Sequence, residues 1–112
     1  MALFKIFKDE TGKYRFFLKS NHNQIIFTSR GYSSRLICFN YIQLIKKFAL
    51  KDEKYERHIS LNESPYFEFK VSKNKVIGIS EKFISKNVME NIIAMIKTNA
   101  NEAKIDSITY SI

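Results

Sequence analysis

The feature that most constrains the fold of this chain is an internal repeat. Sliding the sequence along itself by 51 positions aligns its two halves without a gap. Identical residues then coincide: Phe16 with Phe67, Lys19 with Lys70, Asn23 with Asn74, Ile26 with Ile77, Ser29 with Ser80, Ser34 with Ser85, Asn40 with Asn91, Ile42 with Ile93, Ile45 with Ile96, Lys46 with Lys97 and Ala49 with Ala100. The apolar pattern agrees as well, which predicts two copies of one folding unit. Residues 1–53 form repeat one, and residues 54–112 form repeat two with a closing strand.

Each copy shows the pattern of three strands followed by one helix. Apolar residues alternate with period two in the expected strands, which are residues 3–8, 14–20 and 25–29 in repeat one and residues 54–60, 66–72 and 76–80 in repeat two. Ser33 or Ser34, and Ser85, are suited to cap helices, because a hydroxyl oxygen can accept a hydrogen bond from a free amide. Apolar residues then recur at spacings of three and four, as on one helix face. Residues 105–112 are rich in β-branched side chains and predict a last strand.

These elements predict an α+β fold in the order βββα–βββα–β. A unit of three strands and one helix is too small to cover its own apolar face. We therefore expect the two units to share one mostly antiparallel sheet, with both helices on one face and the chain forming a single domain over residues 1–112. The last strand has no partner in its own copy, so it should return to the edge of an earlier copy.

Composition excludes several classes of protein. The chain is 45% hydrophobic and 14% aromatic, which is typical of a globular domain. Its one cysteine, Cys38, lies in an apolar run and cannot form an internal disulfide, which favours a reducing compartment. No window resembles a signal peptide or a membrane span, and no glycine-rich phosphate loop is present. We therefore expect a cytoplasmic protein that does not enter membranes.

Several stretches of both copies carry a pattern seen in a known family. They are Phe4-Lys-Ile-Phe-Lys-Asp, Gly12-Lys-Tyr-Arg-Phe, Ile25-Ile-Phe-Thr-Ser, Tyr32-Ser-Ser-Arg and Asn40-Tyr-Ile-Gln-Leu-Ile-Lys-Lys-Phe-Ala in repeat one, and Lys54-Tyr-Glu-Arg, Tyr66-Phe-Glu-Phe-Lys, Val76-Ile-Gly-Ile-Ser-Glu and Asn91-Ile-Ile-Ala-Met-Ile-Lys-Thr-Asn-Ala in repeat two. The chain resembles the YegP-like bacterial domains of unknown function, which often occur in tandem. The resemblance implies a single sheet made by both units, with C-terminal strands exchanged between them. It supplies no activity and no catalytic residue.

No group of residues in the sequence points to catalysis, a cofactor or a metal. A metal site normally needs three or four ligands at workable spacing. His22 lies in a polar turn, and His58 takes the strand position that Phe7 holds in repeat one. Cys38 aligns with Met89, which indicates a packing position. We expect no enzymatic activity, no cofactor and no metal site.

Asn40 and Asn91 recur in the middle of the two helices, where Asn is a poor helix former. We expect each side chain to make a structural hydrogen bond to the neighbouring hairpin or helix entry.

One face of the expected sheet combines basic and aromatic residues. Repeat one carries a formal charge of +6 and repeat two of +2. The second strand of each copy places Arg15, Phe17 and Lys19, and then Tyr66 and Lys70, on the face that the helices should leave open. Such a face can stack bases and contact phosphates of single-stranded RNA or DNA. The alternative is a solvated, half-polar sheet face.

The helix of repeat one is more apolar than its counterpart. Leu36 and Phe39 are three residues apart, and their counterparts are Asn87 and Glu90. Leu36 and Phe39 either form an exposed surface for a partner or a second copy, or they pack under a loop. The sequence therefore predicts a non-enzymatic protein-interaction or self-association module, with nucleic-acid binding as the alternative.

Overall fold

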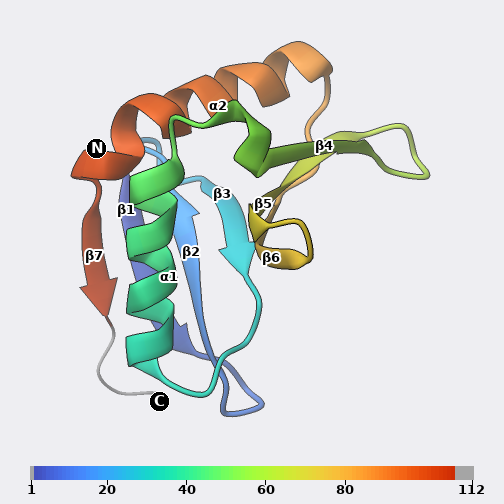
Figure 1. Cartoon of the computed structure of the whole chain (residues 1–112). Helices are drawn as coiled ribbons and strands as arrows, with labels where there is room; N and C mark the ends of the chain where they lie inside the picture. Colours follow the sequence, from blue (N-terminus) through green and yellow to red (C-terminus); the bar gives the residue numbers. More distant parts are fainter. Residues whose placement is uncertain (1, 108–112) are drawn as a thin grey trace.

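The computed structural model describes residues 2–107 and contains the strands and helices that the sequence predicts (Figure 1). Repeat one comprises β1 (Leu3–Lys8), β2 (Tyr14–Lys19), β3 (Ile25–Ser29) and α1 (Arg35–Phe48). Repeat two comprises β4 (Tyr55–Ile59), β5 (Pro65–Ser72), β6 (Lys75–Ser80) and α2 (Lys86–Asn99), followed by β7 (Lys104–Ser107). Single 3₁₀ turns, η1 (Asp52–Lys54) and η2 (Ala100–Glu102), follow the two helices.

The seven strands form one sheet in the order β4-β5-β6-β3-β2-β1-β7. All neighbouring strands are antiparallel except β7, which runs parallel to β1. β7 thus returns to the edge of repeat one, as the sequence predicts. The remainder of the predicted last strand, residues 108–112, lies outside the described residues.

The internal repeat is visible in the strand register. Phe17 pairs with Thr28 in repeat one, and the equivalent residues Glu68 and Ile79 pair in repeat two. The second strand of each copy also shifts register at equivalent positions. At the junction of the copies, Thr28 pairs with Ile79, its own counterpart. The two repeats are therefore related by an approximate two-fold axis that passes between β3 and β6.

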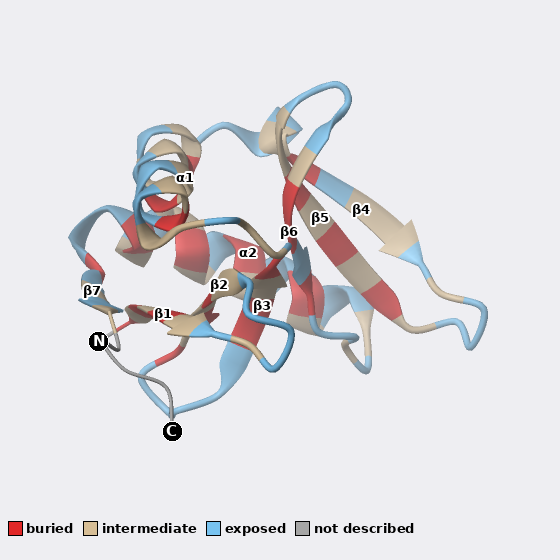
Figure 2. Cartoon of the chain, turned by 90° about the horizontal axis from the view of Figure 1, so that it is seen from below, coloured by how far each residue is buried: buried red, intermediate tan, exposed pale blue. Residues whose placement is uncertain are grey.

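Both helices cover the same face of the sheet, so the other face is open (Figures 1 and 2). α1 packs against β1, β2 and β5, and α2 packs against β5. Ser34 and Ser85 are the N-caps, and each Oγ accepts a hydrogen bond from a backbone amide of the first turn. Burial alternates along β5, as the coloured bands in Figure 2 show. Neither helix of residues 2–107 is long and apolar enough to span a bilayer.

A row of aromatic rings runs through the core and connects the two repeats. Ring centroids lie 6.2 Å apart for Phe4 and Phe16, and 6.4 Å apart for Phe16 and Phe27. Phe27 of β3 then lies 6.3 Å from Phe67 of β5. All four side chains are fully buried. The Phe27–Phe67 contact crosses the junction, so the two repeats share one core.

Gly78 makes room for Phe27 at this junction. A Cβ on Gly78 would lie 2.3 Å from Cε2 of the Phe27 ring, a distance at which atoms overlap. Gly78 and Phe27 are equivalent positions of the repeat and lie beside the two-fold axis. Only one of the two can therefore carry a large side chain.

Two buried serines connect the second and third strands of each copy in the same way. Ser29 Oγ accepts a hydrogen bond from the Phe16 amide at 2.9 Å and donates to the Arg30 carbonyl at 2.7 Å. The equivalent Ser80 repeats both bonds in repeat two. These bonds satisfy a buried amide and a buried hydroxyl at once, which explains why serine recurs there.

Substitution of Gly78 by alanine tests the junction. Gly→Ala in a strand usually stabilises by about 0.4–1 kcal/mol, because the unfolded chain loses freedom. Here the added methyl group meets the rigid Phe27 ring, so overpacking should lower the free energy of unfolding by about 1–3 kcal/mol. Urea denaturation measures the change.

Gly31→Ala is the matched control for Gly78→Ala. A Cβ on Gly31 would lie 2.9 Å from Lys13 Cδ, 3.1 Å from Lys13 Cβ and 3.5 Å from Arg15 Nη2. These atoms belong to side chains at the surface rather than to a buried ring, so they can shift. We expect a change within about 0.5 kcal/mol. Equal effects of the two substitutions would contradict the packing of Phe27 over Gly78.

Candidate functional site

The open face of the sheet carries the five residues predicted to bind nucleic acid, in two groups. Arg15, Phe17 and Lys19 lie on β2, whereas Tyr66 and Lys70 lie on β5. β3 and β6 separate the two strands, so the groups are about 14 Å apart at the usual strand spacing. The face is thus two patches rather than one continuous surface.

Acidic side chains neutralise part of this open face. Arg15 Nε lies 2.7 Å from Asp9 Oδ2, and Lys70 Nζ lies 2.6 Å from Glu56 Oε2. Together with Thr11, Arg15 also holds the pKa of Asp9 well below its usual value by hydrogen bonding. Lys19 binds the Asn23 carboxamide oxygen and lies over the Phe17 ring. Its ammonium group has no carboxylate partner among residues 2–107.

The structure gathers three residues on β4 and β5 that the sequence analysis did not connect. His58 Nε2 lies 2.9 Å from Glu68 Oε1 and 3.1 Å from Glu56 Oε1. Glu56 and His58 are two residues apart on one strand and so share a face, a signal that is present in the sequence. The position of Glu68 depends on the β4–β5 register, which the repeat pattern alone does not give.

Leu36 and Phe39 are exposed, which decides between the two alternatives that the sequence leaves open. Their exposed fractions are 67% and 41%. They line a shallow, mainly apolar groove of about 420 Å³ between α1 and the β1–β7 edge of the sheet. We call this recess the α1 groove; its lining residues are Ile6, Arg35, Leu36, Phe39, Ile105 and Ser107.

The equivalent region of repeat two is closed by an ion pair. Ile6 and Phe39 of the α1 groove correspond to Arg57 and Glu90. Arg57 Nε lies 2.6 Å from Glu90 Oε2, and Arg57 also binds Asp52. Arg57 and Lys97 hydrogen-bond Asp52 and lower its pKa to about 2. The same position between helix and first strand is therefore polar and bridged in repeat two, but apolar and open in repeat one.

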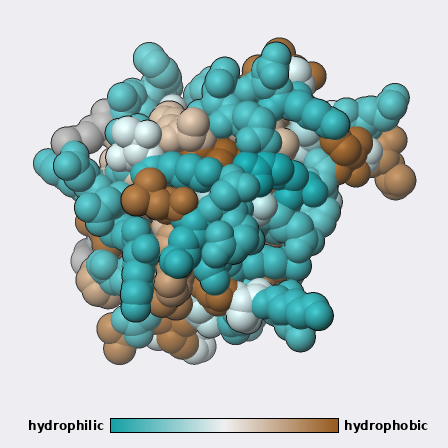
Figure 3. All heavy atoms as spheres, turned by 45° about the horizontal axis from the view of Figure 1, so that its top comes forward, coloured by the Kyte–Doolittle hydropathy of each residue, from teal (hydrophilic) through white to brown (hydrophobic). Residues whose placement is uncertain are grey.

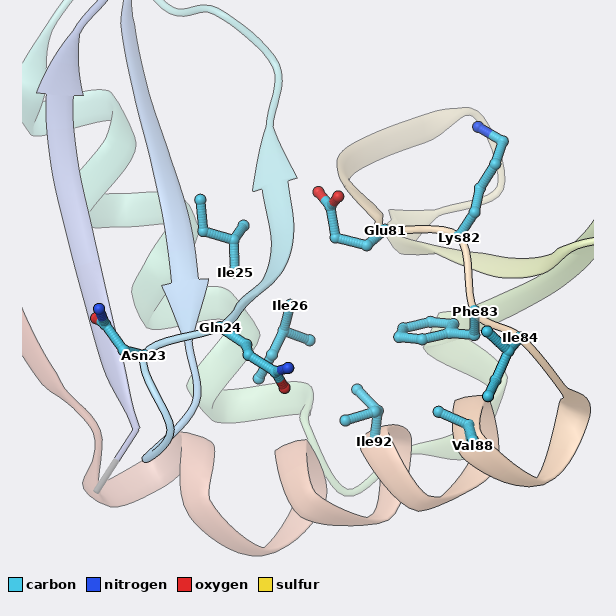
Figure 4. A pocket seen from close by; sticks show the side chains of 10 residues that line it. All are labelled: Asn23, Gln24, Ile25, Ile26, Glu81, Lys82, Phe83, Ile84, Val88 and Ile92. Atoms are coloured by element: carbon cyan, nitrogen blue, oxygen red, sulfur yellow. The ribbon is translucent and has the colours of Figure 1, made fainter.

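A second recess lies at the junction of the repeats (Figure 4). It has a volume of about 600 Å³ and lies between the β2–β3 turn and the segment that joins β6 to α2. Figure 4 shows Phe83, Val88 and Ile92 directed towards Gln24 and Ile26 across the recess. We call this recess the junction cleft.

Repeat one carries two tyrosines at positions equivalent to residues that line the junction cleft. Tyr32 and Tyr41 take the positions of Phe83 and Ile92, and their rings are in contact, with centroids 4.8 Å apart and an interplanar angle of 30°. Lys75 Nζ lies 5.4 Å from the centre of the Tyr41 ring. Tyr41 is thus larger than the equivalent Ile92 and contacts an aromatic neighbour.

Exposed Ile25 and Ile84 line the junction cleft, whereas other exposed apolar side chains lie away from both recesses. Figure 3 shows a mostly hydrophilic surface with apolar atoms at the protruding end of the β4–β5 hairpin. Ile59 is 52% exposed there, and Leu61 in the adjoining turn is fully exposed. Cys38 is fully buried, as predicted, and burial raises the pKa of its thiol to about 11.

The two helix asparagines do not behave as predicted. Asn40 and Asn91 are exposed, and neither side chain hydrogen-bonds to a residue that the structure describes. The predicted hydrogen bond to the hairpin or helix entry is therefore absent among the described residues.

Comparison with known proteins places this fold in a family. The sequence pattern of the family described as "Domain of unknown function (DUF1508)" matches residues 9–56 and again residues 61–106, one match in each repeat. The chain belongs to the DUF1508 family. The match confirms the YegP-like resemblance and the tandem repeat.

Relatives of this DUF1508 chain span nearly its whole length. It is 34% identical over 102 residues to the "UPF0339 protein in ptx operon 5'region" of Stutzerimonas stutzeri, covering 91% of this chain and 92% of that one. It is 32% identical over 111 residues to YegP of Yersinia pestis, covering 97% and 99%. The solution structure of YegP from E. coli, a protein of unknown function, superposes with a TM-score of 0.91 at 26% identity, covering 99% and 96%.

Two tyrosines of the DUF1508 fold whose hydroxyl groups are buried should respond oppositely to removal of those groups. The Tyr32 hydroxyl is buried without a hydrogen-bond partner among residues 2–107, and burial raises its pKa to about 12. Phe83 takes its place in repeat two. Tyr32→Phe should therefore stabilise the protein by about 1 kcal/mol, because an unsatisfied buried group is removed.

Tyr55→Phe is the matched comparison for Tyr32→Phe. The Tyr55 hydroxyl donates a 2.6 Å hydrogen bond to the Ala49 carbonyl, so its loss should destabilise by about 1–3 kcal/mol. Thermal denaturation of both variants measures the difference. Destabilisation by Tyr32→Phe as large as that by Tyr55→Phe would contradict the assignment of Tyr32 as unsatisfied.

Proposed function

We propose that this protein is a non-catalytic binding module that holds a segment of an acidic partner protein in the α1 groove. The observation that carries the proposal is the exposure of Leu36 and Phe39 beside Ile6 and Ile105. Exposed apolar groups that line a common recess are typical of interaction surfaces, whereas scattered ones are not. The Arg57–Glu90 bridge in repeat two supports this, because the fold itself does not require an apolar groove at this position.

The rim of the α1 groove favours an acidic partner. Arg35 stacks on the Tyr14 ring, with the guanidinium carbon 4.9 Å from its centre. Its side chain makes no hydrogen bond or ion pair with any described residue, and its Nη1 is buried without an acceptor. Because Arg35 lines the groove and forms no ion pair with a described carboxylate, its positive charge favours a partner carboxylate there, and guanidinium–carboxylate pairs are among the stronger hydrogen bonds. The formal charge of +8 would attract the same partner at longer range.

Self-association and nucleic-acid binding have weaker support. Two copies that each carry a charge of +8 repel one another, which opposes a dimer through this groove. On the open face, Glu56 and Glu68 lie beside Tyr66 and Lys70, and Arg15 is paired with Asp9. Carboxylates at these positions would repel phosphates. An extended segment with apolar and acidic side chains fits the α1 groove better than a nucleic acid does.

Selection from a displayed library of random 12-residue peptides tests the proposal. Enriched peptides should combine an aliphatic or aromatic residue with Asp or Glu. Bound to the ¹⁵N-labelled chain, such a peptide should shift the amide signals of Leu36, Phe39 and Ile105. The double variant Leu36→Asn, Phe39→Glu carries the residues that repeat two has at these positions, so it should fold normally. The double variant should raise the peptide dissociation constant at least about tenfold. This corresponds to a loss of about 1.4 kcal/mol of binding free energy, as expected when important interface side chains are removed.

Leu50→Asn is the control, because Leu50 is a 78% exposed apolar residue outside the α1 groove, and it should leave peptide affinity unchanged. Three results would contradict the proposal. One is peptide affinity unaffected by the double variant. Another is concentration-dependent dimerisation that the double variant abolishes. The third is salt-sensitive binding of single-stranded RNA that shifts the amide signals of Lys5, Phe17 and Lys19 rather than those of the α1 groove.

A further inference from the structure

Glu56 and Glu68 form an unfavourable pair on the open face. They lie directly opposite each other on β4 and β5. Like charges at directly opposite positions of an antiparallel pair are destabilising. The equivalent residues of repeat one are Lys5 and Phe17, so the fold does not require two acids at these positions. Their side chains are 45% and 20% exposed.

His58 directs a ring nitrogen between the two carboxylates. Its Nε2 is within hydrogen-bonding distance of one oxygen of each, and the three donor atoms lie within 4.8 Å of one another. The imidazole stacks on the ring of Tyr66, its cross-strand partner, with centroids 5.2 Å apart and an interplanar angle of 27°. Stacking fixes the plane of the ring, and two paired strands fix the backbone of all three ligands. The set is therefore pre-organised.

One imidazole nitrogen and two carboxylate oxygens are a common ligand set for divalent transition-metal ions. Zinc binds such nitrogen and oxygen atoms at about 2.0–2.2 Å and completes its shell with water in open sites. We propose that Glu56, His58 and Glu68 form a surface site for a divalent metal ion of the zinc type. The ion would replace the repulsion of the two carboxylates by attraction, because it brings two positive charges between them. Small rotations of the two Glu side chains bring the donors to ligand distance.

Lys70 modulates this site. Its Nζ lies 2.6 Å from Glu56 Oε2, the oxygen that does not face His58. The ammonium group therefore leaves Oε1 directed at the site while it lowers the negative charge available to an ion. Lys70 also contacts the Lys73 carbonyl at 3.4 Å, which places it at the edge of the site rather than within it. Removal of its charge should increase metal affinity.

Titration of the full chain with ZnCl₂, without an affinity tag and in a buffer that does not bind metal, tests the proposal by calorimetry. We expect calorimetry to give one bound ion per chain. We also expect NMR spectra of the ¹⁵N-labelled chain to show shifts of amide signals confined to β4 and β5. His58→Ala and the isosteric Glu68→Gln should each raise the zinc dissociation constant at least about tenfold. Lys70→Met should lower it. Circular dichroism verifies that the variants fold.

The other histidine provides a matched control. His22 lies in the exposed β2–β3 turn, and His22→Ala should leave zinc affinity unchanged. Absence of zinc binding by the intact chain would overturn the proposal. So would zinc binding that persists in both His58→Ala and Glu68→Gln, or that is lost in His22→Ala, because the cluster would then be an ion-pair network without a role in metal binding.

Discussion

The pairing of β3 with β6 over the Phe27–Gly78 contact is the constraint on which the rest of this structure depends. Neither repeat can bury its own apolar face, since three strands and one helix offer too little area. Joining the copies along β3 and β6 creates a seven-stranded sheet and lets the aromatic row continue from Phe16 through Phe27 to Phe67. The junction can form only because one of two equivalent positions lacks a side chain. A duplicated unit thus builds one continuous sheet through a local departure from its own symmetry.

Departures from symmetry also distinguish the α1 groove, the junction cleft and the carboxylate–histidine cluster from their counterparts in the other repeat. The α1 groove exists because Ile6 and Phe39 replace the ion pair of Arg57 and Glu90. Ile92 lines the junction cleft where repeat one has the larger Tyr41. The carboxylate–histidine cluster takes positions that are basic or aromatic in repeat one. Away from the Phe27–Gly78 junction, positions that differ between the copies are not fixed by the fold, so they are where specific chemistry can be added.

Much of the fold is predictable from the sequence because it depends on local patterns. Period-two alternation locates the strands, the serines at 34 and 85 cap the helices as expected, and the 51-residue repeat predicts the shared sheet. The contacts of the candidate sites are less predictable, because they depend on which residues lie opposite each other across strands. His58 looked isolated in the sequence, yet the β4–β5 register places Glu68 beside it. Asn40 and Asn91 are identical in the two repeats but do not make the predicted hydrogen bond. A residue that is identical in both repeats therefore need not make a structural contact.

Residue-resolved unfolding tests the central claim, that both repeats share one core, most directly. The amide signals of the ¹⁵N-labelled chain are followed through a urea titration, with Phe16 and Phe67 reporting on the cores of the two copies. A shared core predicts that the folded signals of both residues disappear at the same urea concentration and with the same slope, as in a cooperative two-state transition. Separate midpoints for the two repeats would contradict the claim, because each copy would then unfold without the other.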